Sequence, residues 1–456
     1  MKRVEKLKPF SSELLDVVKE VIIQLRNAGY KAYCVGGCAR DTLLKITPKE
    51  YDITTSATPQ EVSKIFPHTV PIGVSFGVIL VIVGQYQFEV ATFRKDQSYS
   101  DGRHPDSVTY STEEQEDVLR RDFTINGMLY DPIKEEVIDY VNGMDDLENK
   151  IIRTIGDPVE RFKEDKLRMM RAIRFSSRHN FELDTNTFQA IRELAPEIRQ
   201  VSSERIRDEI IKIISQKNPG LGLKMLSESG LLKYVLPDID IMKGVEQPPQ
   251  FHPEGDVFVH TCLVLDKLFQ NEGGVVSPEL AIGALLHDVG KPPTFSVSDR
   301  IRFNGHDRLG AEISKRICRE LKFSNKQIEI IYSLVREHLK FKDVFNMKKS
   351  TLKRFIGMPH FGEHMSLHLA DCQASHGLMG AYDFIMQKFS EFEEEEIKPA
   401  PLLSGKELIE MGYKPGPIFS EILNFVEEAQ LEGEIKDTEK ARKIVSQKYP
   451  ADKFIN

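Results

Sequence analysis

The sequence predicts a mixed α/β head with a mixed β-sheet, followed by an all-α remainder. Two observations lead to this prediction. Short apolar segments typical of strands dominate the chain up to about residue 140, whereas from about residue 155 onward apolar residues recur at helical spacing. The chain has 456 residues, which is enough for several domains.

The elements of the head follow from its apolar pattern. Residues 1–30 are predicted to form an amphipathic helix, because apolar side chains recur at helical spacing at Leu14, Leu15, Val18, Ile22 and Leu25. Strands are predicted at residues 31–35, 77–83, 87–93 and 137–140. Gly84 and Gln85 separate two of these strands and indicate a hairpin turn.

Pro and Gly residues mark the predicted boundaries. Asp157 can cap a helix that has Pro158 at its first position, and residues 237–253 and 398–404 are further breaks. We therefore expect a head at 1–155 and a helical neck at 156–216. A helical linker is expected at 217–250, a second helical domain at 251–395 and a helical tail at 396–456.

Composition narrows the function class. The net charge of −8 disfavours a nucleic-acid partner, but a local basic stripe is sufficient, and residues 120–121 and 161–178 provide one. The longest apolar run, residues 78–83, is too short to span a bilayer, and no apolar core follows the basic start, so neither membrane association nor a signal peptide is expected. Five cysteines without metal-binding spacing favour the cytoplasm.

Chemistry in the head is expected where a strand runs into Gly36 and Gly37. Paired glycines before a helix let backbone N–H groups approach a phosphate, and Arg40 adds positive charge. Glu50 and Asp52 lie on one face of an extended segment, as two oxygen ligands for Mg²⁺ would. Taken alone, these residues are more often a turn with surface acids, so the interpretation depends on the rest of the set.

Six blocks in this order resemble the class II nucleotidyltransferases, which comprise bacterial CCA-adding enzymes, A-adding enzymes and poly(A) polymerases. The matching segments are residues 36–41, 51–55, 88–94, 101–105, 120–128 and 164–168. The resemblance implies a nucleotidyltransferase head in which Glu50 and Asp52 carry two Mg²⁺ ions, with Glu89 as a third acid. Glu50 departs from the Asp usual in the family, and residues 101–105 match a segment that accompanies addition of the terminal A.

The resemblance also assigns nucleotide-binding roles. Arg121, Asp122 and Asn126 match the block that contacts the ribose and the triphosphate. Glu164, Asp165 and Arg168 match the protein template for the base, and Asp165 and Arg168 are expected to be neighbours on one helix face. Their carboxylate and guanidinium groups suit the Watson–Crick edges of C and A. Arg171 and Arg174 continue this helix toward triphosphate or tRNA, whereas residues 203–205 match a block expected to be structural.

A second constellation lies in the block predicted at residues 251–395. Imidazole and carboxylate groups recur at His260, His287, Asp288 and Asp371, a combination that suits a divalent transition metal such as Mn, Ni, Co or Fe. This pattern resembles the HD phosphohydrolase superfamily, with those four residues as ligands. His306 and His338 are candidates for a second metal or for substrate binding, and Lys291 for a phosphate contact.

The predicted function is therefore template-independent addition of C and A nucleotides to the 3′ end of tRNA. CTP and ATP are the expected substrates, and pyrophosphate is the expected product. The HD block is expected to hydrolyse phosphate esters on RNA ends. Three alternatives stay open: a poly(A) polymerase, an HD phosphohydrolase with a transfer-impaired head, and a non-catalytic tRNA-binding scaffold. The sequence does not distinguish addition of the full CCA from addition of A alone, and it does not predict the oligomeric state.

Overall fold

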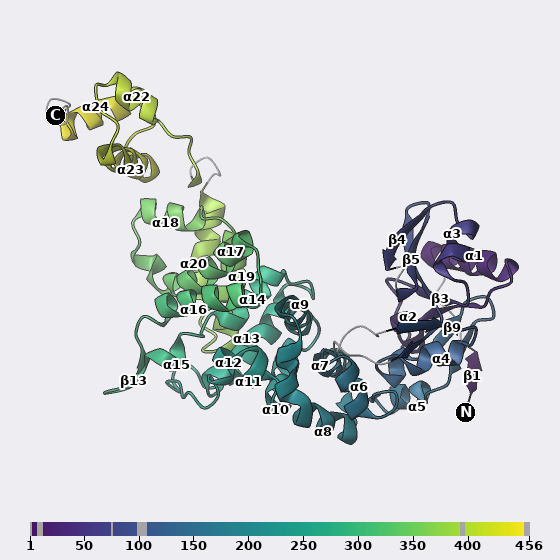
Figure 1. The fold of residues 1–456 in the computed structure, drawn as a ribbon. Coiled ribbons are helices and arrows are strands. Elements are labelled where there is room, and N and C mark those ends of the chain that lie inside the picture. The colour runs from purple at the N-terminus through teal and green to yellow at the C-terminus, as the bar shows by residue number, and fades with distance from the viewer. Residues whose placement is uncertain (1, 7–11, 74–75, 98–106, 393–396, 451–456) are drawn as a thin grey trace. The chain divides into compact units, whose positions relative to one another are not determined.

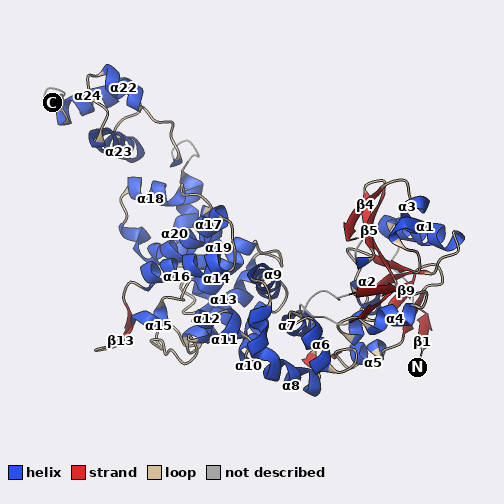
Figure 2. Cartoon of the chain, viewed as in Figure 1, coloured by secondary structure: helices blue, strands red, loops and turns tan. Residues whose placement is uncertain are grey.

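The structure is a computed structural model that describes residues 2–6, 12–73, 76–97, 107–392 and 397–450. It forms two compact units (Figure 1). The first unit contains Met1–Asp240 with Glu320–Lys322, and the second contains Ile241–Arg319 with Phe323–Asn456. Figure 2 shows that the large sheet belongs to the first unit, whereas the second is almost wholly helical. None of the described helices is both long and apolar enough to cross a membrane.

The head is built on an eight-stranded mixed sheet, as predicted. Its strand order is β1-β10-β9-β2-β3-β6-β5-β4, and within this order only β3 and β6 pair in parallel. The strands are β1 (Arg3–Lys6), β2 (Ala32–Val35), β3 (Asp52–Thr55), β4 (Thr69–Gly73), β5 (Val78–Val83), β6 (Tyr86–Thr92), β9 (Leu129–Asp131) and β10 (Glu136–Asp139). Three small two-stranded sheets accompany it in the chain: β7 (Arg94–Gln97) with β8 (Ser107–Tyr110), β11 (Ile151–Ile152) with β12 (Glu182–Leu183), and β13 (Phe295–Val297) with β14 (Ile301–Phe303).

The predicted strands and the hairpin turn are confirmed, with β5 and β6 antiparallel and Gly84 at a φ of 59° between them. The prediction of helix throughout residues 1–30 is wrong at its start. Arg3–Lys6 forms an exposed edge strand that pairs with β10, where the sheet satisfies its backbone groups. The helix itself, α1 (Glu13–Asn27), begins after Ser12, whose hydroxyl accepts from the backbone N–H of Leu15.

Helices cover the sheet and continue into the helical part of the first unit. The head helices are α2 (Gly37–Leu43), α3 (Pro59–Ile65), α4 (Glu114–Leu119), η2 (Thr124–Asn126) and α5 (Gly143–Glu148). They are followed by α6 (Pro158–Glu164), α7 (Arg168–His179), α8 (Thr185–Leu194), η3 (Ala195–Gln200), α9 (Ser203–Ile214), α10 (Pro219–Glu228), α11 (Leu232–Val235) and α12 (Pro237–Asp240). Asp157 caps α6 and Pro158 occupies its first turn, as predicted.

The second unit is a helical body with a small C-terminal cluster. Its helices are α13 (Val257–Asn271), α14 (Pro278–Leu286), α15 (Lys291–Thr294), α16 (His306–Glu320), α17 (Asn325–Glu337), η4 (His338–Asn346), α18 (Lys349–Ile356), α19 (Phe361–Ala374), α20 (Gly380–Glu391), α22 (Gly405–Glu410), α23 (Pro417–Glu432) and α24 (Thr438–Lys448). Helices α13, α14, α17 and α19 pack together, and buried apolar residues of α22, α23 and α24 form a cluster of their own. The helix before the predicted His–Asp pair, α14, is fully buried along its apolar positions.

Candidate functional site

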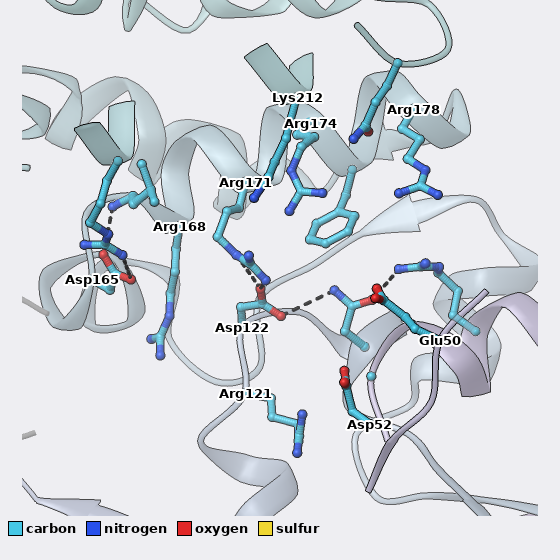
Figure 3. A pocket seen from close by; sticks show the side chains of 18 of the residues that line it. Glu50, Asp52, Arg121, Asp122, Asp165, Arg168, Arg171, Arg174, Arg178 and Lys212 are labelled. Atoms are coloured by element: carbon cyan, nitrogen blue, oxygen red, sulfur yellow. Dashed lines mark hydrogen bonds and ion pairs between the residues drawn. The ribbon is translucent and has the colours of Figure 1, made fainter. Parts of the chain in front are cut away.

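A cavity of about 660 Å³ lies in the first unit, where the sheet faces α7 and α9 (Figure 3). The residues of the first unit that were predicted for nucleotide or Mg²⁺ binding line it, with the exception of Glu89 and Glu164. The lining residues are Gly36, Gly37, Arg40, Glu50, Asp52, Arg120, Arg121, Asp122, Asn126, Asp165, Leu167, Arg168, Arg171, Arg174, Phe175, Arg178, Arg205, Lys212 and Gln216. Residues 101–105, which the resemblance links to terminal A addition, lie outside the described part of the chain.

Three carboxylates meet at the sheet side of the cavity. Asp52 and Glu89 precede the paired residues Ile53 and Val90 of the parallel strands β3 and β6, so they occupy neighbouring positions at one point of the sheet. Burial, together with repulsion from Glu89 and Glu50, raises the pKa of Asp52 to about 6. Gly36 adopts a positive φ of 79°, which favours glycine, and its Cα lies beside Asp52, since an added Cβ would be in ordinary contact with Asp52 Oδ2 at 3.6 Å. A divalent cation would relieve this repulsion, so the donors fit Mg²⁺.

Polar side chains connect the two walls of the cavity. Arg171 on α7 donates to Asp122 Oδ2 at 2.5 and 2.9 Å, and Asn126 donates to the other oxygen at 3.4 Å. Asn126 accepts in turn from the buried Arg40 at 2.7 Å, and Arg40 also donates to Asp41. Burial alone would raise the pKa of Asp122, but the Arg171 guanidinium lowers it to about 2. The predicted ribose-binding residues therefore form one ordered network.

The arginines that follow α4 share a buried acid. Asp117 accepts from Arg120 at 2.6 Å and from Arg121 at 2.8 Å. Among the described residues, no acceptor lies within hydrogen-bond distance of Arg121 Nε, although this atom is buried. Asp117 thus holds Arg121 at the edge of the cavity with a donor to spare, as a phosphate contact requires.

The prediction that Asp165 and Arg168 are neighbours on one helix face is wrong. Asp165 ends α6 in an extended conformation, and Arg168 begins α7, so the backbone turns between them. Both residues still line the cavity, but each has another partner: Asp165 Oδ2 accepts from Arg205 at 2.8 Å, and Arg168 pairs with Glu164. Both side chains thus reach the same cavity from two different helix ends.

Helix α9 and its C-terminal end contribute cavity residues that sequence reasoning missed, namely Arg205, Lys212 and Gln216. Arg205 stands in the block expected to be structural. The signal was present in the spacing: positions 205, 209, 212 and 216 fall on one helix face, and Glu209 on that face pairs with the buried Arg174. Arg178 on α7 is a further missed residue.

The second unit brings the predicted HD residues together. His260 Nε2 lies 3.1 Å from Asp371 Oδ1 and 3.3 Å from His287 Nε2, and Asp288 Oδ2 lies 3.2 Å from His287 Nε2. His306 and His338 face the other oxygen of Asp288, with Nε2 at 3.5 and 3.9 Å from Oδ1. Asp288 therefore belongs to one group that could hold a metal ion, with His306 and His338, and its other oxygen adjoins a second such group of His260, His287 and Asp371.

Each imidazole is oriented by a protein acceptor at its other nitrogen. His287, His306 and His338 place Nδ1 2.7–2.8 Å from backbone carbonyl oxygens, those of Ala284, Phe303 and Val335 respectively. His260 instead places Nδ1 2.7 Å from the carboxylate of Glu254, a residue that sequence reasoning did not single out. All four Nε2 atoms are thereby turned toward the cluster, as in sites where histidines ligate metals. Burial lowers the pKa of His338 to about 3, which keeps the neutral, ligating form.

Lys291 also contacts the HD cluster. Its Nζ lies 2.7 Å from Asp288 Oδ2 and donates to Gln247 at 2.6 Å, and the side chain is buried. The predicted phosphate-binding lysine is thus held at the cluster by an acid and an amide.

Comparisons with known proteins match segments in both units. Residues 32–153 match the poly A polymerase head domain, residues 180–242 match a probable RNA- and SrmB-binding site of polymerase A, and residues 258–372 match the HD domain. The CCA-adding enzyme of Ligilactobacillus salivarius is 31% identical over 437 residues, which span 94% of this chain and 96% of that protein. The chain belongs to the CCA-adding enzyme family.

Other relatives share this family. The CCA-adding enzyme of Limosilactobacillus reuteri (strain DSM 20016) is 43% identical over 223 residues, so the match spans 48% of this chain and only 55% of that protein. The crystal structure of the Bacillus stearothermophilus CCA-adding enzyme in complex with CTP superposes with a TM-score of 0.75 at 25% identity, covering 97% of this chain and 100% of that one. The Thermotoga maritima CCA-adding enzyme complexed with tRNA shares the fold, with a TM-score of 0.61, 20% identity and coverage of 98% and 100%.

Proposed function

We propose that this chain is an enzyme that adds C and A nucleotides to the 3′ end of tRNA without a nucleic-acid template, using CTP and ATP and releasing pyrophosphate. One observation carries the proposal. One cavity presents the carboxylates of Glu50 and Asp52, the polar network around Asp122 and Asn126, and the side chains of Asp165 and Arg168 from two helix ends. Family membership and the likeness to a structure holding CTP support it.

In this proposal, Glu50, Asp52 and Glu89 would hold Mg²⁺. Mg²⁺ bound there supplies activation of the attacking 3′-hydroxyl and charge neutralisation at the triphosphate. The Arg121 guanidinium, which lines the cavity, offers positive charge to the phosphates, and the backbone after Gly36 lets N–H groups approach their oxygens. Asp122 and Asn126, already ordered by Arg171 and Arg40, are positioned to hydrogen-bond the ribose hydroxyls.

Asp165 and Arg168 would read the base. A carboxylate accepts from the exocyclic amino group of cytosine or adenine, and a guanidinium donates to ring or carbonyl acceptors, so uracil and guanine present the wrong order. The template is thus two side chains rather than a strand. Recognition of tRNA would depend on shape and backbone charge, as expected for A-form RNA.

The test is nucleotide incorporation with Mg²⁺ on tRNA ending at the discriminator base, at C and at CC, each with CTP, ATP or both. Full CCA on the shortest tRNA supports the proposal. One A on the CC end alone would make the chain an A-adding enzyme, and long A tails would make it a poly(A) polymerase. No incorporation by the folded protein would refute the proposal.

The position of Asp288 between two groups favours a second activity. We infer that His260, His287, Asp288 and Asp371 hold one divalent transition metal (Mn, Ni, Co or Fe), and that His306 and His338 complete a second site through the same carboxylate. Metal there supplies Lewis-acid polarisation of a phosphate ester, while Lys291 offers a positive charge to it. Phosphate release from RNA ends that carry a 2′,3′-cyclic phosphate or a terminal monophosphate tests this activity.

We also propose that the enzyme works in the cytoplasm. All five cysteines are free and buried, so no disulfide contributes to the fold. Free thiols are the expected state in a reducing compartment. Fractionation of cells that express the tagged chain is the corresponding measurement.

A further inference from the structure

A second cavity, of about 330 Å³, opens directly beside the HD cluster in the second unit. It is formed by η4, α19, the segment after α19 and the start of α20. Its lining residues are His338, Leu339, Phe341, Lys342, Phe345, His368, Asp371, Cys372, His376, Leu378, Gly380 and Ala381. His338 and Asp371 belong to the two groups that could hold a metal ion, so the cavity is continuous with both.

Most of the rest of the lining is apolar or aromatic, with Lys342, Cys372 and His376 as its other polar side chains. His368 stacks on Phe341 with ring centroids 4.0 Å apart and planes 5° from parallel, which makes a flat wall. Phe345 is 58% exposed and rests on the ring of Phe384, with centroids 5.0 Å apart. Leu378 is 68% exposed. A folded protein rarely leaves several large apolar side chains at the mouth of a polar cluster unless a ligand covers them.

We propose that this cavity binds the nucleobase of a nucleotide whose phosphate reaches the HD cluster. The inference rests on the phosphohydrolase function proposed above. An exposed aromatic ring beside a centre for phosphate esters is the arrangement by which proteins stack bases, and a cavity of this volume suits a small ligand. Lys342 on the rim supplies positive charge toward the adjoining backbone phosphate.

The lining also predicts how selective this subsite is. Among the described residues that line it, none carries an amide, hydroxyl or guanidinium group, and its one carboxylate, Asp371, faces His260. The remaining polar side chains are imidazoles, a thiol and the ammonium of Lys342, which lack the paired groups of a bidentate contact to a base edge, whereas every base has a face that stacks. The subsite therefore accepts all four bases, in contrast to the Asp165 and Arg168 pair of the head.

Stacking can be measured without turnover. The probes are 2-aminopurine riboside 3′-monophosphate and a short RNA that ends in the same nucleotide, whose fluorescence is quenched when the base stacks. The full chain is titrated in EDTA, in a background carrying Asp165→Ala and Arg168→Ala so that the head does not read the base. Phe345→Ala is compared with Phe345→Tyr and with Phe389→Ala, which removes an aromatic ring that is 52% exposed and lies outside the cavity.

We expect Phe345→Ala to weaken binding about tenfold or more, because a base–aromatic contact is lost. Phe345→Tyr and Phe389→Ala should bind as the background chain does. Tighter binding of the RNA than of the mononucleotide would identify an RNA end as the ligand, and equal binding would identify free nucleotides. Equal quenching in the presence and absence of the Phe345 ring would overturn the proposal.

Hydrolysis separates this proposal from the one on which it rests. With Mn²⁺, Phe345→Ala should raise the KM for all four nucleoside 3′-monophosphates about tenfold and leave kcat and the hydrolysis of glycerol 2-phosphate unchanged. Unchanged KM values, or a preference for one base above about tenfold, would contradict the subsite while the phosphohydrolase function stands. Quenching that depends on Phe345 without hydrolysis of any ester would refute the phosphohydrolase function and retain the base-binding subsite.

Discussion

The ion pair between Arg205 and Asp165 predicts a loss of base discrimination when Arg205 is replaced by Ala. Arg205 Nη2 lies 2.8 Å from Asp165 Oδ2, and the other carboxylate oxygen accepts from the backbone N–H of Leu167 at 3.1 Å. Together the two contacts fix the plane of the carboxylate. Each oxygen has a second lone pair, so the base can bind while Arg205 stays in place, and the arginine orients the template rather than competing with the nucleotide.

The size of the effect follows from burial. The side chains of Arg205 and Asp165 are 23% and 17% exposed, so solvent screens the pair only in part. A hydrogen bond to a charged group contributes roughly 1.5–3 kcal/mol, which partial exposure reduces to about 1–2 kcal/mol. We therefore expect Arg205→Ala to lower kcat/KM for CTP and ATP about 5- to 30-fold, with a much smaller change for UTP and GTP.

The assay is single-nucleotide incorporation on tRNA ending at the discriminator base and at CC, with each of the four nucleotides. Arg205→Lys should recover part of the loss, because the contact uses a single donor nitrogen. Arg192→Ala, which changes an exposed arginine of the same unit outside the cavity, is the control. Wild-type discrimination against UTP in Arg205→Ala would refute the positioning role and leave Asp165 independent of α9.

Three further outcomes are expected. Burial would raise the pKa of Asp117, but its two arginine partners lower it to about 2, so its stabilising effect is complete above about pH 4 and disappears as pH falls through 2. Asp117→Asn should lower the free energy of unfolding by about 2 kcal/mol at pH 7. It should also reduce the fall of this free energy at acidic pH, measured by urea titrations followed by circular dichroism. Asp52→Asn should reduce nucleotide incorporation about a thousandfold without changing the circular dichroism spectrum. Glu50→Asp should change incorporation less than about tenfold. A large rise of incorporation in Glu50→Asp would instead indicate that Glu50 impairs the head. Asp288→Ala should remove metal from both HD groups in elemental analysis, whereas His306→Ala should remove about half; equal losses would contradict two sites.

The sequence predicted the architecture well because its signals are local. Strand alternation, the glycines at the start of α2 and the cap at Asp157 each act within a few residues. The edge strand Arg3–Lys6 escaped prediction because its partner, β10, lies far along the chain, and its own residues are exposed and carry no apolar pattern.

The pattern of errors is similar at the site. Residue types identified the two clusters, but the break between α6 and α7 and the partnership of Asp165 with Arg205 depend on tertiary packing. Arg168 N–H donates to the Asp165 carbonyl within the break, a local turn that helical periodicity conceals. The position of Asp288 between two groups likewise depends on which carboxylate oxygen faces which imidazole. The spacing of these residues in the sequence does not specify this orientation.

Three acids in or beside the cavity of the first unit are already paired with arginines that line it. Asp122 is paired with Arg171, Asp165 with Arg205, and Glu164 with Arg168. An incoming nucleotide therefore meets ordered donors and acceptors that already interact with protein partners. It gains binding free energy by replacing or sharing those partners rather than by forming a full set of new contacts. Such a site would bind a nucleotide less tightly than one whose partners are free. The proposed enzyme, which would release pyrophosphate and then admit a further nucleotide, needs this exchange of occupants more than it needs tight binding.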